Sequence, residues 1–188
     1  MQSAAGERVR WTAADLDLLP DNGNRYEIID GELFVTRAPH WKHQQVSGRV
    51  FARLDAWSSA GGSGQAAVVP GVLFGEADNV IPDVVWASGE RLNILLDPAG
   101  HLSGAPELVV EVLSPGAQNV RRDRELKLKL YSVRGVLEYW IVDWQLQQVE
   151  VYRREQAVLT LAATLLETDT VSSPLLPGFA CAVGPLFA

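Results

Sequence analysis

A single carboxylate interrupts the most strand-like apolar stretch of the chain, the segment PELVVEVLSP at residues 106–115. Leucine and valine surround Glu111 on both sides, a pattern typical of a strand that is buried on both faces of a sheet. A carboxylate that leaves water without a partner costs several kcal/mol or more. Glu111 therefore needs a partner in the fold, either a metal ion or a basic side chain such as an arginine of the following helix.

The overall composition is that of one globular domain. The chain has 188 residues, of which 47% are hydrophobic and 21% charged, and we expect a single domain over residues 1–188. The N-terminal segment lacks the apolar stretch of a signal peptide, and no segment is apolar enough for a membrane helix. The single cysteine, Cys181, excludes an intramolecular disulfide. We expect a cytoplasmic protein that does not associate with membranes.

The charge is unevenly distributed along the chain. A net charge of −7 argues against a protein that coats nucleic acid by bulk electrostatics. Residues 121–134 nevertheless carry a charge of +4, which leaves −11 for the rest of the chain. A basic helix is usually a solvated face, but it can also hold phosphate groups.

Hydrophobic periodicity predicts two main helices. The first covers residues 40–59 and carries one apolar stripe made of Val46, Val50, Phe51, Leu54 and Trp57. The second covers residues 121–134 and ends at Gly135. Its helical spacing places Arg124, Lys127, Tyr131 and Arg134 on one face, opposite Leu126, Leu130 and Val133. A further short helix is predicted between Thr12 and Pro20.

Strand patterns between these helices predict an α/β fold with a mixed central sheet. A hairpin with its turn at Asp30-Gly31 precedes the first main helix. Single strands are predicted within residues 66–74, 79–87, 108–113, 136–144, 148–154 and 157–167, with one last short strand in the tail at 173–187. The stretch from residue 88 to residue 105 is predicted to be irregular.

A second carboxylate, Asp83, lies in the middle of the apolar segment NVIPDVVWA. If the strands of Asp83 and Glu111 are neighbours in the sheet, the two carboxylates meet and repel each other, and a divalent cation relieves this repulsion. Oxygen ligands suit Mg²⁺ or Mn²⁺. A lysine that reaches from the second helix could orient or activate a metal-held water and stabilise negative charge on a phosphate.

Several segments, taken in order, resemble the Uma-type restriction-endonuclease family, a bacterial branch of the PD-(D/E)xK nuclease superfamily. They are YEIIDGELF, IPDVVW, PELVVEVLSP, DRELKLKLY followed by GVLEYWIVD, and LLPGF, and they extend from about residue 11 to about residue 187. The resemblance implies a restriction-endonuclease-like mixed central sheet flanked by two main helices, with extra β-hairpins. It also implies a Mg²⁺- or Mn²⁺-dependent endonuclease that hydrolyses phosphodiester bonds, with DNA as the expected partner.

By this resemblance Asp83 and Glu111 are the metal-binding catalytic carboxylates, and the backbone carbonyl of Val112 is a further metal ligand. The superfamily places its lysine two residues after the glutamate, where this chain has Leu113. In the Uma-type branch the lysine comes instead from the following helix, four residues before a tyrosine.

That spacing identifies Lys127 as the catalytic lysine, with Lys129 as the alternative. Glu27 and His43 also match recurrent positions of the family and are expected to be auxiliary. The residues expected to contact nucleic acid are Arg121, Arg122, Arg124 and Lys129.

Two other functions fit the same residues. The first is a catalytically inactive nuclease fold that serves as a binding or assembly module, against which stabilisation by metal would count. The second is a metal-dependent hydrolase of small phosphate compounds, which a deep enclosed pocket would favour over an open groove. A homodimer is a further expectation, because cleavage of both strands of a duplex commonly uses two-fold symmetry.

Overall fold

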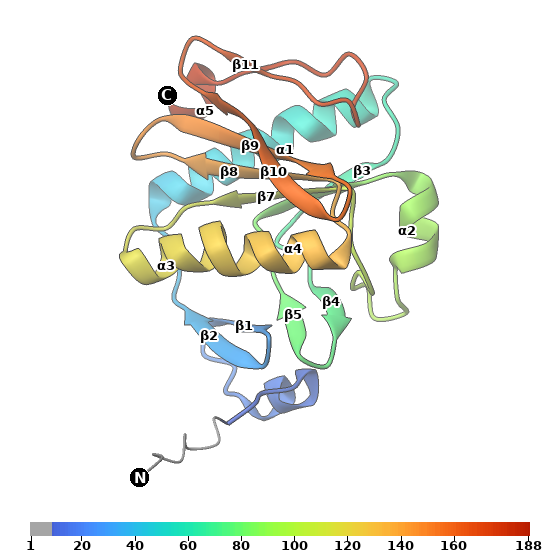
Figure 1. Ribbon diagram of the computed structural model, residues 1–188, viewed down its shortest axis with the longest axis vertical. Coiled ribbons are helices and arrows are strands. Elements are labelled where there is room, and N and C mark those ends of the chain that lie inside the picture. The colour runs from blue at the N-terminus through green and yellow to red at the C-terminus, as the bar shows by residue number, and fades with distance from the viewer. Residues whose placement is uncertain (1–8) are drawn as a thin grey trace.

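A six-stranded mixed sheet forms the centre of the computed structural model, which describes residues 9–188 (Figure 1). Its strands are β3 (Gln65–Val68), β6 (Val84–Ala87), β7 (Leu108–Val112), β8 (Glu138–Asp143), β9 (Gln148–Glu155) and β10 (Val158–Leu165). Their order is β10-β9-β8-β7-β6-β3. The central strands β7 and β8 are parallel, and every other neighbouring pair is antiparallel. The predicted mixed central sheet is confirmed.

A second, four-stranded sheet lies beside the first. Its strands are β1 (Arg25–Ile29), β2 (Glu32–Thr36), β4 (Val72–Gly75) and β5 (Asp78–Val80), in the order β2-β1-β5-β4. The β1–β2 hairpin turns at Asp30 and Gly31, as predicted, and both residues have positive φ, 50° and 72°.

The prediction of a single strand over residues 79–87 is wrong. The structure has two strands there, β5 and β6, because Pro82 has no N–H to donate to a continuous ladder. Asp83 consequently lies at the junction between the two sheets. The strand predicted over residues 66–74 is divided in the same way between β3 and β4, on either side of Pro70.

Two main helical segments cover the two faces of the central sheet (Figure 1). Helix α1 (Trp41–Ser59) packs Val46, Val50 and Leu54 against one face. The second segment consists of α3 (Ala117–Arg121), the π-helical turn η2 (Arg122–Lys127) and α4 (Leu128–Arg134). It packs Leu130 and Tyr131 against the other face. The two predicted main helices are therefore present.

The second helix differs from its prediction in one important respect. It begins at residue 117 rather than at residue 121, and its π turn breaks the regular 3.6-residue period. Lys127 is only 1% exposed and Tyr131 is fully buried, whereas Val133, predicted to lie on the apolar face, is 72% exposed. The face of this helix that is turned into the protein interior thus carries Lys127 together with Tyr131.

The remaining elements are short. The 3₁₀ helix η1 (Ala13–Leu18) lies at the predicted N-terminal helix, and α2 (Gly89–Leu95) lies in the stretch predicted to be irregular. The tail contains the predicted short strand, β12 (Cys181–Ala182), which pairs with β11 (Thr170–Val171), and ends in α5 (Gly184–Phe187). Within residues 9–188, no helix combines the length and the apolar character needed to cross a membrane.

The packing of α1 on the sheet predicts a large stability effect at Leu54, which is fully buried. We expect Leu54→Ala to lower the free energy of unfolding by about 2–5 kcal/mol, because it removes buried methyl groups and leaves a cavity. The control Leu18→Ala, at a side chain that is 81% exposed, should change the free energy by less than about 0.5 kcal/mol. Urea unfolding measures both values, and equal effects would contradict the packing described.

Candidate active site

The pairing of β6 with β7 brings Asp83 beside Glu111. The antiparallel register joins Val84 to Val110, so the residue before β6 lies next to the residue after Val110. Both carboxylates are buried, and the backbone N–H of Val112 donates to Asp83 Oδ2 at 2.9 Å. The two strands are therefore neighbours, which is the arrangement that a shared site requires.

Glu111 has two hydrogen-bond donors on one of its oxygens. Lys127 Nζ lies 2.8 Å from Glu111 Oε1, and the Tyr131 hydroxyl donates to the same oxygen at 2.9 Å. Glu111 Oε2 accepts no hydrogen bond from any residue in the described part of the chain, 9–188. The partner that this carboxylate needs within the protein is thus a lysine of the following helix, and its second oxygen remains available to a ligand.

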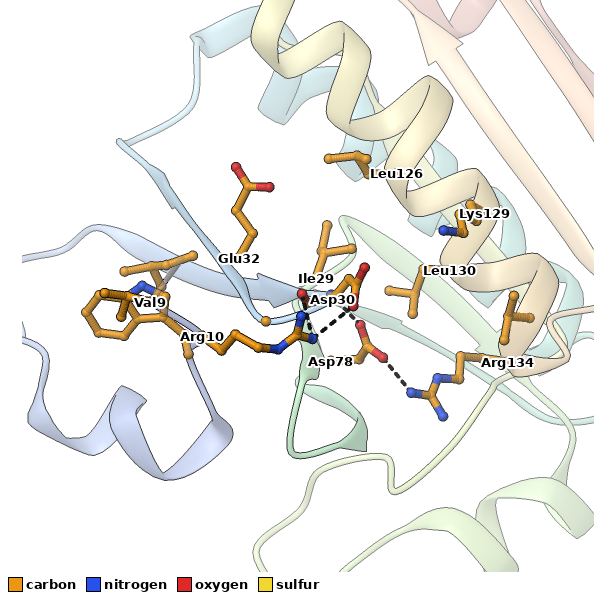
Figure 2. Close-up of a pocket in the computed structure, with 14 residues that line it drawn as sticks. Val9, Arg10, Ile29, Asp30, Glu32, Asp78, Leu126, Lys129, Leu130 and Arg134 are labelled. Carbon is orange, nitrogen blue, oxygen red and sulfur yellow. Dashed lines mark hydrogen bonds and ion pairs between the residues drawn. The ribbon is translucent and has the colours of Figure 1, made fainter. Parts of the chain in front are cut away.

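The Lys127 ammonium is shared among three carboxylates. Besides Glu111, it lies 2.8 Å from Glu27 Oε1 and 3.9 Å from Asp123 Oδ1. Glu27 also accepts the backbone N–H of Ile81 at 2.8 Å. Lys129 has a different environment: it is exposed, and it lines a separate groove of about 770 Å³ between η2–α4 and the N-terminal part of the chain, where Figure 2 shows it beside Leu130.

Asp83 is held by three donors. Arg25 Nη1 contacts Asp83 Oδ1 at 3.1 Å, and His43 Nε2, from the first turn of α1, lies 3.1 Å from Asp83 Oδ2, which also accepts the Val112 N–H. The other ring nitrogen of His43, Nδ1, is buried and has no partner among residues 9–188. The structure therefore brings both auxiliary residues, Glu27 and His43, into contact with the predicted catalytic residues.

Arg122 belongs to the same buried network. Its Nε contacts Asp123 Oδ1 at 2.8 Å, its Nη1 donates to the Thr36 hydroxyl at 2.9 Å, and it lies 4.0 Å from Glu27 Oε2. This side chain is almost completely buried. Arg122 therefore contributes to the buried ion network of the site, and its side chain would have to move to reach a nucleic acid.

The other side chains expected to bind nucleic acid do not form one cluster. Arg121 forms an exposed ion pair with Glu125 at 3.1 Å, and Arg124 pairs with Asp143 and Glu150. Lys129 lies in the groove of Figure 2. Their role in nucleic-acid binding stays a prediction.

Burial and neighbouring charges shift the pKa values of the two carboxylates in opposite directions. Burial raises the pKa of Glu111 to about 8; Lys127 opposes this shift, and the charge of Asp83 adds to it. Burial acts on Asp83 in the same direction but is outweighed by His43, the Val112 N–H and Arg25, which lower the pKa of Asp83 to about 2. Asp83 is therefore an anion at neutral pH, whereas Glu111 is partly protonated.

The Lys127 ammonium keeps its proton. Burial would lower the pKa of this group, but the charges of Glu111, Glu27 and Asp123 outweigh burial and raise the pKa above its usual value. Lys127 can therefore donate hydrogen bonds and stabilise negative charge, but it cannot accept a proton from water at neutral pH.

Three residues of the network were not among the sequence candidates. Tyr131 and Asp123 lie four residues on either side of Lys127, a spacing at which helical side chains are neighbours. Arg25 precedes Glu27 by two residues, so strand alternation places both on one face. These spacings are visible in the sequence, but they do not predict that Tyr131 contacts Glu111 or that Arg25 contacts Asp83.

A small cavity adjoins the site. It has a volume of about 20 Å³ and is lined by Arg25, Glu27, Thr36, Arg37, Pro39, His43, Asp83, Glu111, Ser114, Arg122 and Lys127. This is roughly the space that one water molecule or ion needs. Residues 9–188 contain no ready-made group of three or more His, Cys, Asp or Glu side chains that could hold a metal. Because Mg²⁺ commonly binds one or two carboxylates and completes its shell with water, Asp83 and Glu111 fit a partial ligand set.

A family model described as "Uma2: Putative restriction endonuclease" matches residues 13–184. The chain belongs to this family. No curated protein matches the chain. A solved structure with a similar fold is the crystal structure of a putative nuclease belonging to DUF820 from Anabaena variabilis ATCC 29413, with a TM-score of 0.73 and 19% sequence identity. The similarity covers 94% of this chain and 97% of that chain and shows that the two share a fold. The family resemblance and the fold expected from the sequence are both confirmed.

The environment of Lys127 predicts a sharp contrast with Lys129. Lys127→Met leaves Glu27 and Glu111 without their shared cation, and we expect the free energy of unfolding to fall by about 3–5 kcal/mol. Lys129→Met removes an exposed ammonium from the same helix and should change the value by less than about 0.5 kcal/mol. Urea unfolding of both variants tests the contrast, and a Lys127→Met protein as stable as the wild type would refute the described ion network.

Proposed function

We propose that this Uma2-family chain is a metal-dependent endonuclease that hydrolyses phosphodiester bonds of DNA. The observation that carries the proposal is the contact between Lys127 and Glu111 beside Asp83, at the junction of the two sheets. Two carboxylates and one ammonium next to a small cavity supply cation ligands and a positive charge at one place. The family description, a restriction endonuclease, supports DNA as the substrate.

In this proposal Asp83 and Glu111 would hold Mg²⁺ or Mn²⁺, with the backbone carbonyl of Val112 as a further ligand. The bound metal would supply a Lewis acid and a water of lowered pKa. Lys127 and Tyr131 fix Glu111 through Oε1, so Oε2 is the oxygen left for the cation. Arg25, now paired with Asp83 Oδ1, is half-buried and can exchange that contact for a phosphate oxygen.

Lys127 acts by charge and hydrogen bonding. It stays protonated, so it donates a hydrogen bond to the attacking water or to a phosphate oxygen and stabilises the negative charge that develops there. Glu27 and Asp123 also contact the ammonium and help to hold it in place. Cleavage of both strands of a duplex would be carried out by two copies of the chain.

The size of the site cavity weighs against the hydrolase of small phosphate compounds. About 20 Å³ cannot enclose such a molecule. The larger groove of Figure 2 is lined by neither Asp83, Glu111 nor Lys127. A polymer that places one phosphate at the mouth of the cavity fits the site better.

Cleavage assays test the proposal directly. The wild type should cleave DNA in the presence of Mg²⁺ or Mn²⁺ and not in the presence of a chelator. Glu111→Gln removes the charge but keeps the shape of the side chain, and we expect it to lower the cleavage rate by roughly 100-fold or more. The control Glu125→Gln, at an exposed carboxylate of the helix that carries Lys127, should cleave at the wild-type rate.

Metal binding separates the nuclease from the inactive module. Calorimetry of the wild type with Mg²⁺ or Mn²⁺ should show binding that Asp83→Ala or Glu111→Ala abolishes, because each variant removes half of the carboxylate set. The melting temperature of the wild type should rise with metal concentration. A wild type that binds neither metal at millimolar concentration would favour the inactive module, with Glu111 as an ion-pair partner of Lys127 alone.

A further inference from the structure

Three aromatic residues, His40, Trp41 and Trp144, lie at the edge of the sheet where the candidate site lies. Trp41, the first residue of α1, is 73% exposed. His40, which precedes it, stacks on Trp144 with ring centroids 5.1 Å apart and an angle of 12° between the ring planes. Figure 1 shows the first turn of α1 and the C-terminal ends of β7 and β8 at this same edge.

We call Trp41 and the His40–Trp144 stack the aromatic cluster. It lies next to residues that line the site cavity. The indole N–H of Trp144 donates to the carbonyl of Leu113 at 3.0 Å, and the next residue, Ser114, lines the cavity. Pro39 and His43, which flank His40 and Trp41 in sequence, line the cavity as well. The cluster therefore adjoins the place where a phosphate would be cleaved.

Two cations accompany the rings. Arg37 is exposed and lines the cavity, and Lys42 is half-buried beside Trp41 in sequence. Within residues 9–188, neither side chain takes part in an ion pair. Exposed aromatic faces next to unpaired cations are the combination with which proteins bind single-stranded nucleic acid, since bases stack on the rings and phosphates meet the cations.

Local structure accounts for two of the three rings but not for Trp41. His40 caps α1 by accepting the N–H of Lys42, and Trp144 is anchored by its hydrogen bond to Leu113. Trp41 forms no ring pair with another aromatic residue of the described chain. By contrast, Trp86 and Trp140 are buried in the core, where tryptophan contributes to packing. An indole this exposed beside a candidate active site points to a ligand with a flat apolar face.

We propose that the aromatic cluster stacks on unpaired bases beside the cleaved phosphate, so that the preferred substrate is single-stranded DNA rather than a continuous duplex. This inference rests on the proposed nuclease function and names its substrate class. In a duplex the base faces are covered by their neighbours, so stacking on Trp41 requires nucleotides that are single-stranded or extruded from the helix.

Binding to oligonucleotides tests the inference without catalysis. In the presence of EDTA, the full chain should bind a fluorescent single-stranded DNA of mixed sequence more tightly than the duplex of the same sequence. Trp41→Ala should weaken single-strand binding roughly 5- to 150-fold, the range for loss of one stacked base, and Trp41→Phe should retain most of it. Ile94→Ala, at a 71% exposed apolar side chain of α2, is the matched control and should bind like the wild type.

The outcomes separate this inference from the nuclease proposal. Unchanged single-strand binding by Trp41→Ala, or an equal loss for single strand and duplex, would overturn the stacking role. Metal-dependent cleavage that is unaffected by Trp41→Ala on both substrates would do the same while the nuclease proposal stands. Absence of cleavage by the wild type, together with single-strand binding that depends on Trp41, would overturn the nuclease proposal and keep the stacking surface.

Discussion

The buried ammonium of Lys127 joins three parts of the fold. It contacts Glu27 of the four-stranded sheet and Glu111 of the six-stranded sheet, and it comes from the π turn of the helix packed against both. Because these charges are out of water, removal of Lys127 leaves Glu27 and Glu111 without their shared cation, at a cost of several kcal/mol. The relative position of the two sheets and the geometry of the candidate site therefore depend on the same set of contacts.

The helix that carries Lys127 contains a π turn at residues 122–127, and its inward face makes the contact with Glu111. The periodicity of residues 121–134 predicts Lys127 and Tyr131 on one face and Val133 on the opposite, apolar face. In the structure the face of Lys127 and Tyr131 is turned toward Glu111, and Val133 is exposed. Turns of the π type are less regular than the α-helix and occur frequently at functional sites. The inward face of this helix therefore carries two polar groups, Lys127 and Tyr131, that both contact Glu111.

The predictable part of the site is the part encoded by short-range patterns. Carboxylates inside apolar segments drew attention to Asp83 and Glu111, and the family resemblance, through the four-residue spacing to Tyr131, selected Lys127; the structure brings these residues together. The π turn was not predictable, because periodicity arguments assume 3.6 residues per turn. The contact of Arg25 with Asp83 was not predictable either, since it joins positions 58 residues apart whose proximity follows from the strand break at Pro82. Long-range polar contacts depend on the packing of whole elements, and local patterns carry little information about that packing.

The balance of charge at the site is consistent with the proposal that Glu111 binds a metal cation in addition to Lys127. Four buried carboxylates, Glu27, Asp83, Glu111 and Asp123, face the basic side chains of Arg25, Arg122 and Lys127, and His43 also contacts Asp83. The carboxylate that bears the excess is Glu111, whose pKa burial raises to about 8. In the proposed nuclease, the divalent cation would supply the further positive charge beside this cavity, and Glu111 Oε2, which accepts no hydrogen bond from residues 9–188, would be the atom that meets it.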